Sequence, residues 1–155
     1  GETYLFYYNV GVAKDKYQTA SSWLKESVEN YPVAKIYCDI STCLQNVYKY
    51  SKANQTAKLY EEYKNLWNEV IILYDEADDL DDDLKILVWN EIANMVNSNC
   101  KEFCEVTSVN ELNSLLKDIS SKSSAVTNTF LKENVDSLQA NIETTLTKIS
   151  TVESK

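Results

Sequence analysis

The chain has 155 residues, of which 44% are hydrophobic, and it contains only two glycines and one proline. That length supports one sizeable core, and the scarcity of turn residues favours long helices over a many-stranded sandwich or barrel. The formal net charge is −9 and every basic residue is a lysine, with no run of lysines, which argues against nucleic acid as a partner. These numbers predict an all-α fold, a single compact domain of about six helices.

Apolar spacing in the first third of the chain predicts two helices, with a short third one possible at the start. Residues 1–15 hold a dense aromatic cluster in which a short helix fits, and residues 16–31 place apolar side chains at three- and four-residue steps. Pro32 ends that pattern and suits the first turn of a second helix over residues 33–53. A break near residues 41–42 stays open, because this sequence also fits the start of a capping box.

A third helix is predicted over residues 56–77, followed by the acidic run at residues 75–83. The aspartates at the end of this run are expected to cap the next helix, predicted over residues 82–105, whose positive N-terminus favours carboxylates. Two alternatives for the run are a calcium site, although it lacks the glycine and spacing of an EF-hand loop, and an electrostatic contact for a cationic partner.

The last third of the chain predicts two more helices. Ser108-x-x-Glu111 has the form of a capping box ahead of an apolar pattern that ends near Ile119, and the serines of residues 120–124 indicate a polar joint. The final helix is expected to carry an apolar stripe that begins at Phe130 and recurs almost in heptads. One face of that helix must therefore be buried.

Four cysteines predict two disulfides. Cys38, Cys43, Cys100 and Cys104 form an even set, and Asn54 opens the single Asn-x-Thr sequon, a glycosylation candidate. Both features point to an oxidising compartment and hence to secretion. Their spacings differ from the usual Cys-x2-Cys zinc knuckle, and no histidine assists, so no metal site is expected.

The pairing of these cysteines stays open. An antiparallel ladder joins Cys38 to Cys104 and Cys43 to Cys100, and the parallel alternative exchanges the partners. Local pairing is the least attractive, because a regular helix gives an i,i+4 pair poor disulfide torsions. Cross-links between the helices disfavour a plain up-and-down bundle. They require either that the middle helix does not return in register or that one cysteine-bearing helix is broken.

Catalytic groups are scarce in this composition. The chain has no histidine, its basic residues include no arginine, and its two glycines cannot build a nucleotide-binding loop. A carboxylate-pair glycosidase is the one formal enzymatic option, and the sequence predicts instead a protein that is not an enzyme and has no cofactor. No apolar run reaches the roughly 20 residues that cross a bilayer, so no membrane partner is expected.

The chain resembles the C-terminal domain of the mosquito salivary GE-rich family, the aegyptin-like and anopheline anti-platelet proteins. The resemblance rests on the four cysteines on helices, strong acidity, tyrosine enrichment and the opening Gly1-Glu2, and it extends from about Thr3 to the end. It implies that this is the C-terminal half of a longer secreted protein whose Gly/Glu-rich N-terminal half is missing. It further implies a protein that binds collagen and blocks collagen-induced platelet adhesion and aggregation.

Collagen's triple helix exposes cationic side chains and imino-acid rings, so acids interleaved with aromatics are the expected contacts. The sequence places such residues on one segment: Tyr60, Glu61, Glu62, Tyr63, Trp67, Glu69, Asp75 and Asp78. The protein is expected to act as a monomer. Two alternatives are a helical carrier of a small apolar ligand and a secreted inhibitor of a host protease or complement enzyme.

Overall fold

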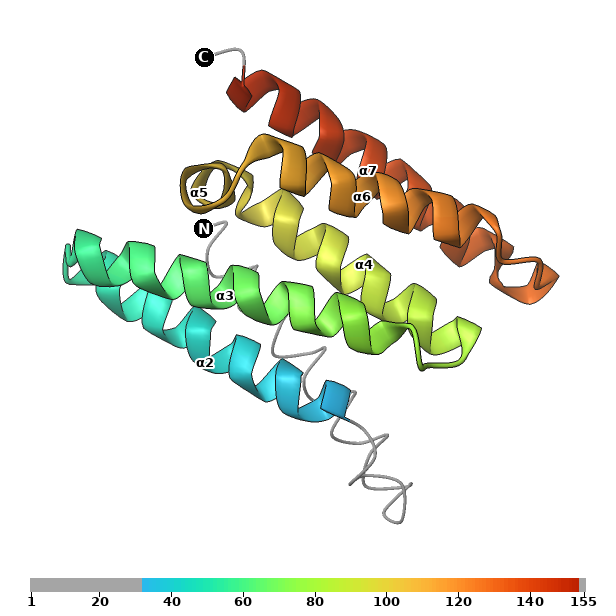
Figure 1. The fold of residues 1–155 in the computed structure, drawn as a ribbon, viewed down its shortest axis with the longest axis horizontal. Coiled ribbons are helices and arrows are strands. Elements are labelled where there is room, and N and C mark those ends of the chain that lie inside the picture. Colours follow the sequence, from blue (N-terminus) through green and yellow to red (C-terminus); the bar gives the residue numbers. More distant parts are fainter. Residues whose placement is uncertain (1–31, 154–155) are drawn as a thin grey trace. The chain divides into compact units, whose positions relative to one another are not determined.

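A computed structural model describes residues 32–153, and the two helices expected within residues 1–31 lie outside this range. The described residues form six α-helices and one short 3-10 helix, with no strand among them (Figure 1). The all-α prediction is confirmed. The chain divides into two compact units, Gly1–Glu76 and Ala77–Lys155, and the expectation of a single domain stays a prediction.

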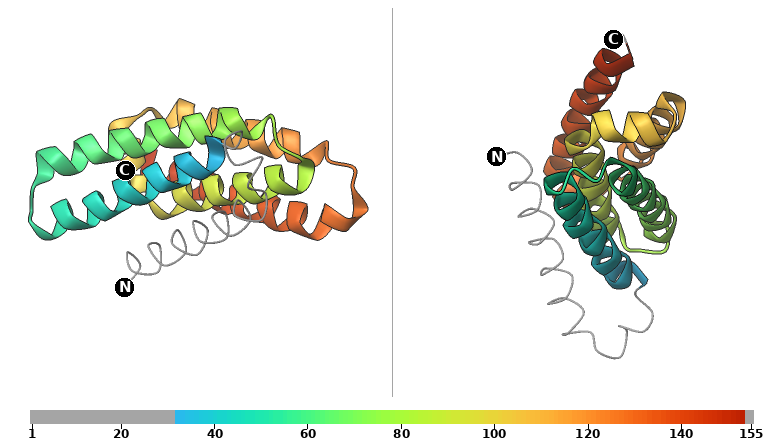
Figure 2. Two further views of the ribbon diagram at one scale, coloured as in Figure 1. Left: turned by 90° about the horizontal axis from the view of Figure 1, so that it is seen from below. Right: turned by 90° about the vertical axis from the view of Figure 1, so that its left-hand side faces the viewer.

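A helical hairpin makes up the described part of the first unit. Helix α2 (Pro32–Lys52) and helix α3 (Thr56–Ala77) lie side by side in both views of Figure 2, and Asn46 of α2 donates a hydrogen bond to Glu62 of α3 over 3.4 Å. The apolar faces of both helices are buried: Val33, Ile36, Tyr37, Ile40, Leu44, Val47, Tyr63, Leu66, Trp67, Val70 and Leu73.

The bounds of these two helices follow local sequence signals. Pro32 begins α2, as the fixed φ of proline allows in a first turn, and Asn54 ends the hairpin turn with a φ of 54°. Helix α2 has no break at residues 41–42, since the Thr42 hydroxyl donates to the carbonyl of Cys38 over 3.1 Å inside a continuous helix.

Four α-helices and the 3-10 helix form the second unit. They are α4 (Asp82–Ser98), α5 (Cys100–Val106), α6 (Val109–Ser124), η2 (Thr129–Leu131) and α7 (Lys132–Glu153). Helix α7 packs against α4, α5 and α6, so it is the central element of this unit. The buried face of α7 consists of Val135, Leu138, Ile142, Thr145 and Ile149, which confirms the expected apolar stripe except at its start.

Three predicted boundaries in this unit are wrong. The helix expected over residues 82–105 is broken at Asn99, whose side chain bonds back to the carbonyl of Met95 over 3.0 Å. Helix α6 continues to Ser124. Ser120 lies inside this helix, where its hydroxyl donates a hydrogen bond to Gln139 of α7 over 2.7 Å. Phe130 lies in η2 with 92% of its surface exposed, so it is not part of the buried stripe.

The capping predictions had mixed outcomes. Ser108 caps α6 as expected, with its hydroxyl accepting a hydrogen bond from the backbone amide of Glu111 over 3.1 Å. Asp81 precedes α4 but its side chain caps nothing, while Asp82 and Asp83 lie in the first turn of α4. The acidic run therefore favours the helix through its dipole more than through capping bonds.

The cysteine ladder is not confirmed. All four cysteines lie on described helices, two on α2 and two on α5, and none of these pairs forms a disulfide. The break at Asn99 matches one of the two conditions that the ladder required of the helices. Within residues 32–153, no helix is both long enough and apolar enough to span a membrane.

Candidate functional site

The predicted contact segment divides into exposed and buried side chains. Tyr60 is 39% exposed, and Glu61 and Asp75 also lie on the surface. Tyr63 and Trp67 are each only 8% exposed, because they belong to the buried face of α3. The two aromatic side chains fill the core of the first unit and offer a partner little surface.

Glu62 and Glu69 are half-buried against α2, near Cys43. Burial, followed by the nearby carboxylates of Glu62, Glu69 and Asp39, raises the pKa of the Cys43 thiol to about 12. Burial and the Asp39 carboxylate also raise the pKa of Glu69, while Lys35 opposes the shift. These acids serve the contact between the two helices, so neither is a fully exposed anion.

Asp78 is neutralised within its own unit. Its carboxylate accepts a hydrogen bond from the ammonium group of Lys122 on α6 over 3.1 Å, and Lys122 also lies 3.4 Å from Asp118. Burial lowers the pKa of Lys122, but its bonds to Asp78 and Asp118 raise it overall. Asp78 therefore holds the start of this unit to α6.

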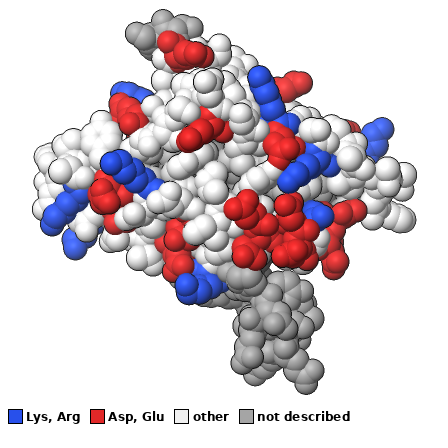
Figure 3. Space-filling model, viewed as in Figure 1, with Lys and Arg blue, Asp and Glu red and all other residues white. Residues whose placement is uncertain are grey.

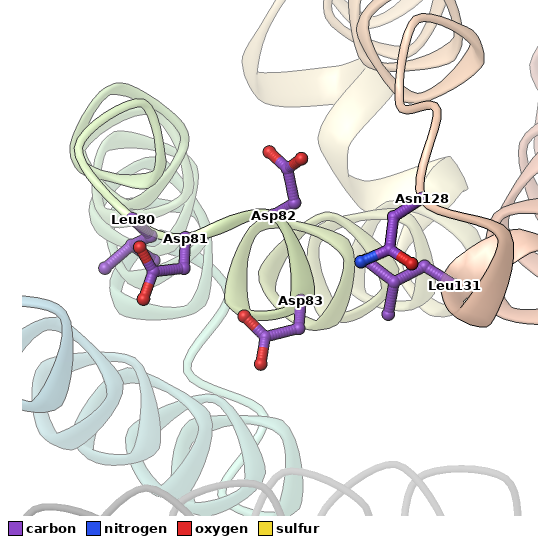
Figure 4. Close-up of a pocket in the computed structure, with 6 residues that line it drawn as sticks. All are labelled: Leu80, Asp81, Asp82, Asp83, Asn128 and Leu131. Atoms are coloured by element: carbon purple, nitrogen blue, oxygen red, sulfur yellow. The ribbon is translucent and has the colours of Figure 1, made fainter.

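An acidic pocket at the start of α4 is the main hollow formed by the acidic run. Its volume is about 630 Å³, and its lining residues are Leu80, Asp81, Asp82, Asp83, Asn128 and Leu131. Figure 4 shows Asp82 and Asp83 on the first turn of α4, Asp81 just before that helix, and Asn128 and Leu131 in the segment before α7. All of these residues belong to the second unit.

Three neighbouring carboxylates make this pocket negatively charged. Within residues 32–153, no lysine forms an ion pair with Asp81, Asp82 or Asp83, and all three side chains are exposed. The Asp83 carboxylate accepts only the backbone amide of Leu84, over 3.0 Å. Figure 3 shows that acidic side chains gather over this region. Lysine or arginine side chains of a partner would complement it.

An exposed aromatic ring stands next to the pocket in sequence. The Asn128 side chain accepts a hydrogen bond from the backbone amide of Phe130 over 3.0 Å, which fixes the turn into η2. Leu131 lines the pocket while Phe130 is 92% exposed. One exposed apolar side chain is ordinary on a protein surface, but beside an acidic pocket it can contribute apolar contact to a cationic partner.

The pocket combines carboxylates with apolar side chains. Among the described residues, no group of three or more cysteine, aspartate or glutamate side chains is placed to hold a metal ion. The pocket carboxylates bond no hydroxyl or thiol in residues 32–153. What the geometry offers is fixed negative charge, two leucines and an exposed ring.

The sequence analysis named Asp75 and Asp78 as contact residues and gave the run at residues 75–83 only as an alternative contact for a cationic partner. It did not single out the residues of this pocket or Phe130 as contacts. The available signal was the sequence Thr127-Asn128-Thr129, because Asn and Thr favour turns and helix starts over helix interiors. Placing the joint at residues 120–124 hid that signal.

The cysteines of α5 are neighbours within one helix. The Cys100 thiol hydrogen-bonds to Cys104, and burial, followed by Cys104, raises the pKa of Cys100 to about 11. Burial also raises the pKa of Cys104, although the bond from Cys100 lowers it in part. Raised pKa values make both thiols poor nucleophiles, so they are structural rather than reactive.

Comparison with known proteins gives no relative: no family model, no curated protein and no solved structure matches the chain.

Proposed function

We propose that this protein is a secreted, non-catalytic collagen-binding protein that covers collagen and so prevents platelet adhesion and aggregation. Its resemblance to the salivary GE-rich family motivates the choice of partner. The observation that carries it is the acidic pocket of Asp81, Asp82 and Asp83, which form no ion pair within residues 32–153. The exposed Phe130 precedes Leu131, a residue of the pocket lining.

Collagen suits this surface on chemical grounds. Its triple helix is a stiff rod of polyproline-II chains in which the X and Y side chains point outward and only glycine lies at the axis. A receptor for such a rod needs carboxylates for the projecting lysine and arginine side chains and a flat apolar ring for the imino acids. Asp81 to Asp83 supply the first and Phe130 supplies the second.

This assignment moves the contact surface away from the middle of α3. Tyr63 and Trp67 are buried, and Asp78 is paired with Lys122, whereas Asp81 to Asp83 and Phe130 are exposed. Tyr60, Glu61 and Asp75 remain exposed candidates for a second contact on the first unit. We expect the protein to act as a monomer without a cofactor. We also expect its four cysteines, which are free thiols in the structure, to form two disulfides on secretion.

Surface plasmon resonance over immobilised fibrillar collagen tests this proposal. Wild-type protein is expected to bind with micromolar affinity, and Asp81→Asn/Asp82→Asn/Asp83→Asn to bind about tenfold more weakly. Asp136→Asn/Glu143→Gln/Glu153→Gln changes three exposed acids of α7 and is the matched control, expected within twofold of wild type. Raising the salt concentration should weaken wild-type binding, since exposed charges are screened over about 8 Å at physiological ionic strength.

Phe130→Ala removes the apolar contribution alone. Because Phe130 is 92% exposed, its loss should leave the folded state unchanged and reduce collagen affinity several-fold. Equal affinity of wild type, both triple variants and Phe130→Ala would place the contact elsewhere. A fluorescent fatty-acid displacement assay run beside it tests the carrier alternative, which displacement without a collagen response would favour.

A further inference from the structure

The end of the α2–α3 hairpin is a positive surface on an acidic protein. No acidic residue occurs from Ile40 to Tyr60, although the chain contains 24 acids, and this stretch carries Lys49, Lys52 and Lys58. The three lysine side chains are exposed. Figure 3 shows basic side chains gathered over the end of the α2–α3 hairpin. We call Lys49, Lys52, Lys58 and Tyr48, Tyr50, Tyr60 the hairpin tip.

Tyrosine rings bring these ammonium groups together. The Lys49 and Lys58 ammonium groups lie 5.9 Å and 5.6 Å from the centre of the Tyr50 ring, so one ring is shared by a lysine from each helix. Lys52 lies 4.7 Å from the centre of the Tyr48 ring. Such distances are within the range of cation–π attraction, which holds ammonium groups near a ring without neutralising their charge.

Among the described residues, no carboxylate forms an ion pair with Lys49, Lys52 or Lys58, in contrast to Lys35 and Lys122. The turn between them adds polar side chains on the surface at Ser51, Asn54 and Gln55. The tip therefore presents three positive charges, hydrogen-bonding groups and partly exposed phenol rings on one end of a rigid hairpin.

We propose that the hairpin tip binds a sulfated polysaccharide of the glycosaminoglycan class. Sulfate groups repeated along a sugar chain pair with the lysines, and the apolar faces of the sugar rings pack on Tyr48 and Tyr60, which are 41% and 39% exposed. A rigid nucleic-acid duplex would be repelled by the acidic remainder of the protein. A flexible polysaccharide chain can contact the tip alone. The three lysines are not part of the proposed collagen contact, whose acidic pocket lies on the second unit; Tyr60 alone is considered for both surfaces.

Heparin is the probe for the test, with isothermal titration calorimetry at low salt and protein produced without glycosylation at Asn54. Wild-type protein is expected to bind heparin, and Lys49→Gln/Lys52→Gln/Lys58→Gln to bind at least tenfold more weakly. Lys101→Gln/Lys117→Gln/Lys132→Gln makes the same change of net charge at exposed lysines of the second unit and should lose less than twofold. Lys49→Arg/Lys52→Arg/Lys58→Arg should retain binding, because arginine also pairs with sulfate.

Two further probes define the partner. Chemically desulfated heparin should bind at least tenfold more weakly than heparin, since sulfate is the group recognised. Vesicles containing phosphatidylserine should not compete with heparin. The proposal is overturned if wild-type protein does not bind heparin, if both glutamine variants lose affinity equally, or if the vesicles displace heparin. Collagen binding by the Lys49/Lys52/Lys58 glutamine variant should equal that of wild type, which separates this site from the proposed function.

Discussion

The side-chain amide of Asn97 on α4 donates a hydrogen bond to the hydroxyl of Thr145 on α7 over 2.9 Å. Thr145 is 0% exposed and donates in turn to the backbone carbonyl of Asn141 over 2.8 Å. The carbonyl oxygen of Asn97 accepts from Lys148, one turn further along α7. A series of hydrogen bonds thus joins α4 and α7 inside a mostly aliphatic interface and fixes their register.

The variant Thr145→Val tests how much these hydrogen bonds contribute to the free energy of unfolding. Valine keeps the shape of threonine but removes the acceptor, which leaves a half-buried amide hydrogen of Asn97 without its best partner. The free energy of unfolding should fall by about 1 kcal/mol, and the melting temperature by about 2–4 °C. Thr144→Val is the control, because Thr144 is exposed and donates only to the carbonyl of Ala140. Equal stability of the two variants in urea denaturation would contradict the assigned role.

The hairpin turn makes a second prediction about stability. Asn54 has a φ of 54°, in the left-handed region where a β-carbon costs about 1 kcal/mol and asparagine is better tolerated than most residues. Asn54→Ala should therefore lower the free energy of unfolding by about 1 kcal/mol, and Asn54→Gly should leave it nearly unchanged. Thermal unfolding followed by circular dichroism measures both, and a less stable glycine variant than alanine variant would be the contrary result.

Much of the fold is readable from local sequence, and the limits of that reading are specific. The two helices expected over residues 33–53 and 56–77 agree closely with α2 and α3, because Pro32 and the turn at Asn54 are strong signals of helix ends. The break at Asn99 is invisible to periodicity, since Val96 and Phe103 both stay buried on either side of it. It depends on a local bond from the Asn99 side chain to the carbonyl of Met95, which the spacing of apolar residues does not reveal.

The candidate site shows the same limit more strongly. Tyr63 and Trp67 share a helix with exposed acids, yet the three-to-four spacing that places them on one face also buries that face. Asp78 looks like its neighbours in sequence and differs only because α6 brings Lys122 to it. Burial and pairing between distant segments decide which acids and aromatics are available, and neither is encoded by composition.

Protein purified from a secreting host is predicted to contain no free thiol. The even count of cysteines and the sequon at Asn54 motivate this expectation, and each bridge across about 60 residues would stabilise the protein by roughly 4 kcal/mol in the chain-entropy model. Alkylation under denaturing conditions followed by peptide mass spectrometry reads both the thiol content and the pairing. Recovery of alkylated Cys38 or Cys104 would show that secretion does not form the bridges.

In the reduced protein, the thiols of Cys43 and Cys100 make stability depend on alkaline pH. Folding raises their pKa values from about 9 to about 12 and about 11, so the folded chain holds these protons more tightly than the unfolded chain. Their contribution is complete below pH 9 and is lost as pH rises through the folded values. The free energy of unfolding should therefore fall between pH 9 and pH 11, with a shallower slope in Cys43→Ala/Cys100→Ala.

The most direct measurement of the central claim is equilibrium binding of the wild-type protein to triple-helical collagen and to heat-denatured collagen, at physiological salt. The proposed surface binds the collagen triple helix, a stiff rod whose charged side chains and imino-acid rings are held in fixed positions. Heat denaturation removes this fixed arrangement. The protein should bind the triple helix with micromolar affinity and the denatured chains at least tenfold more weakly. No saturable binding to triple-helical collagen at micromolar protein would contradict the account.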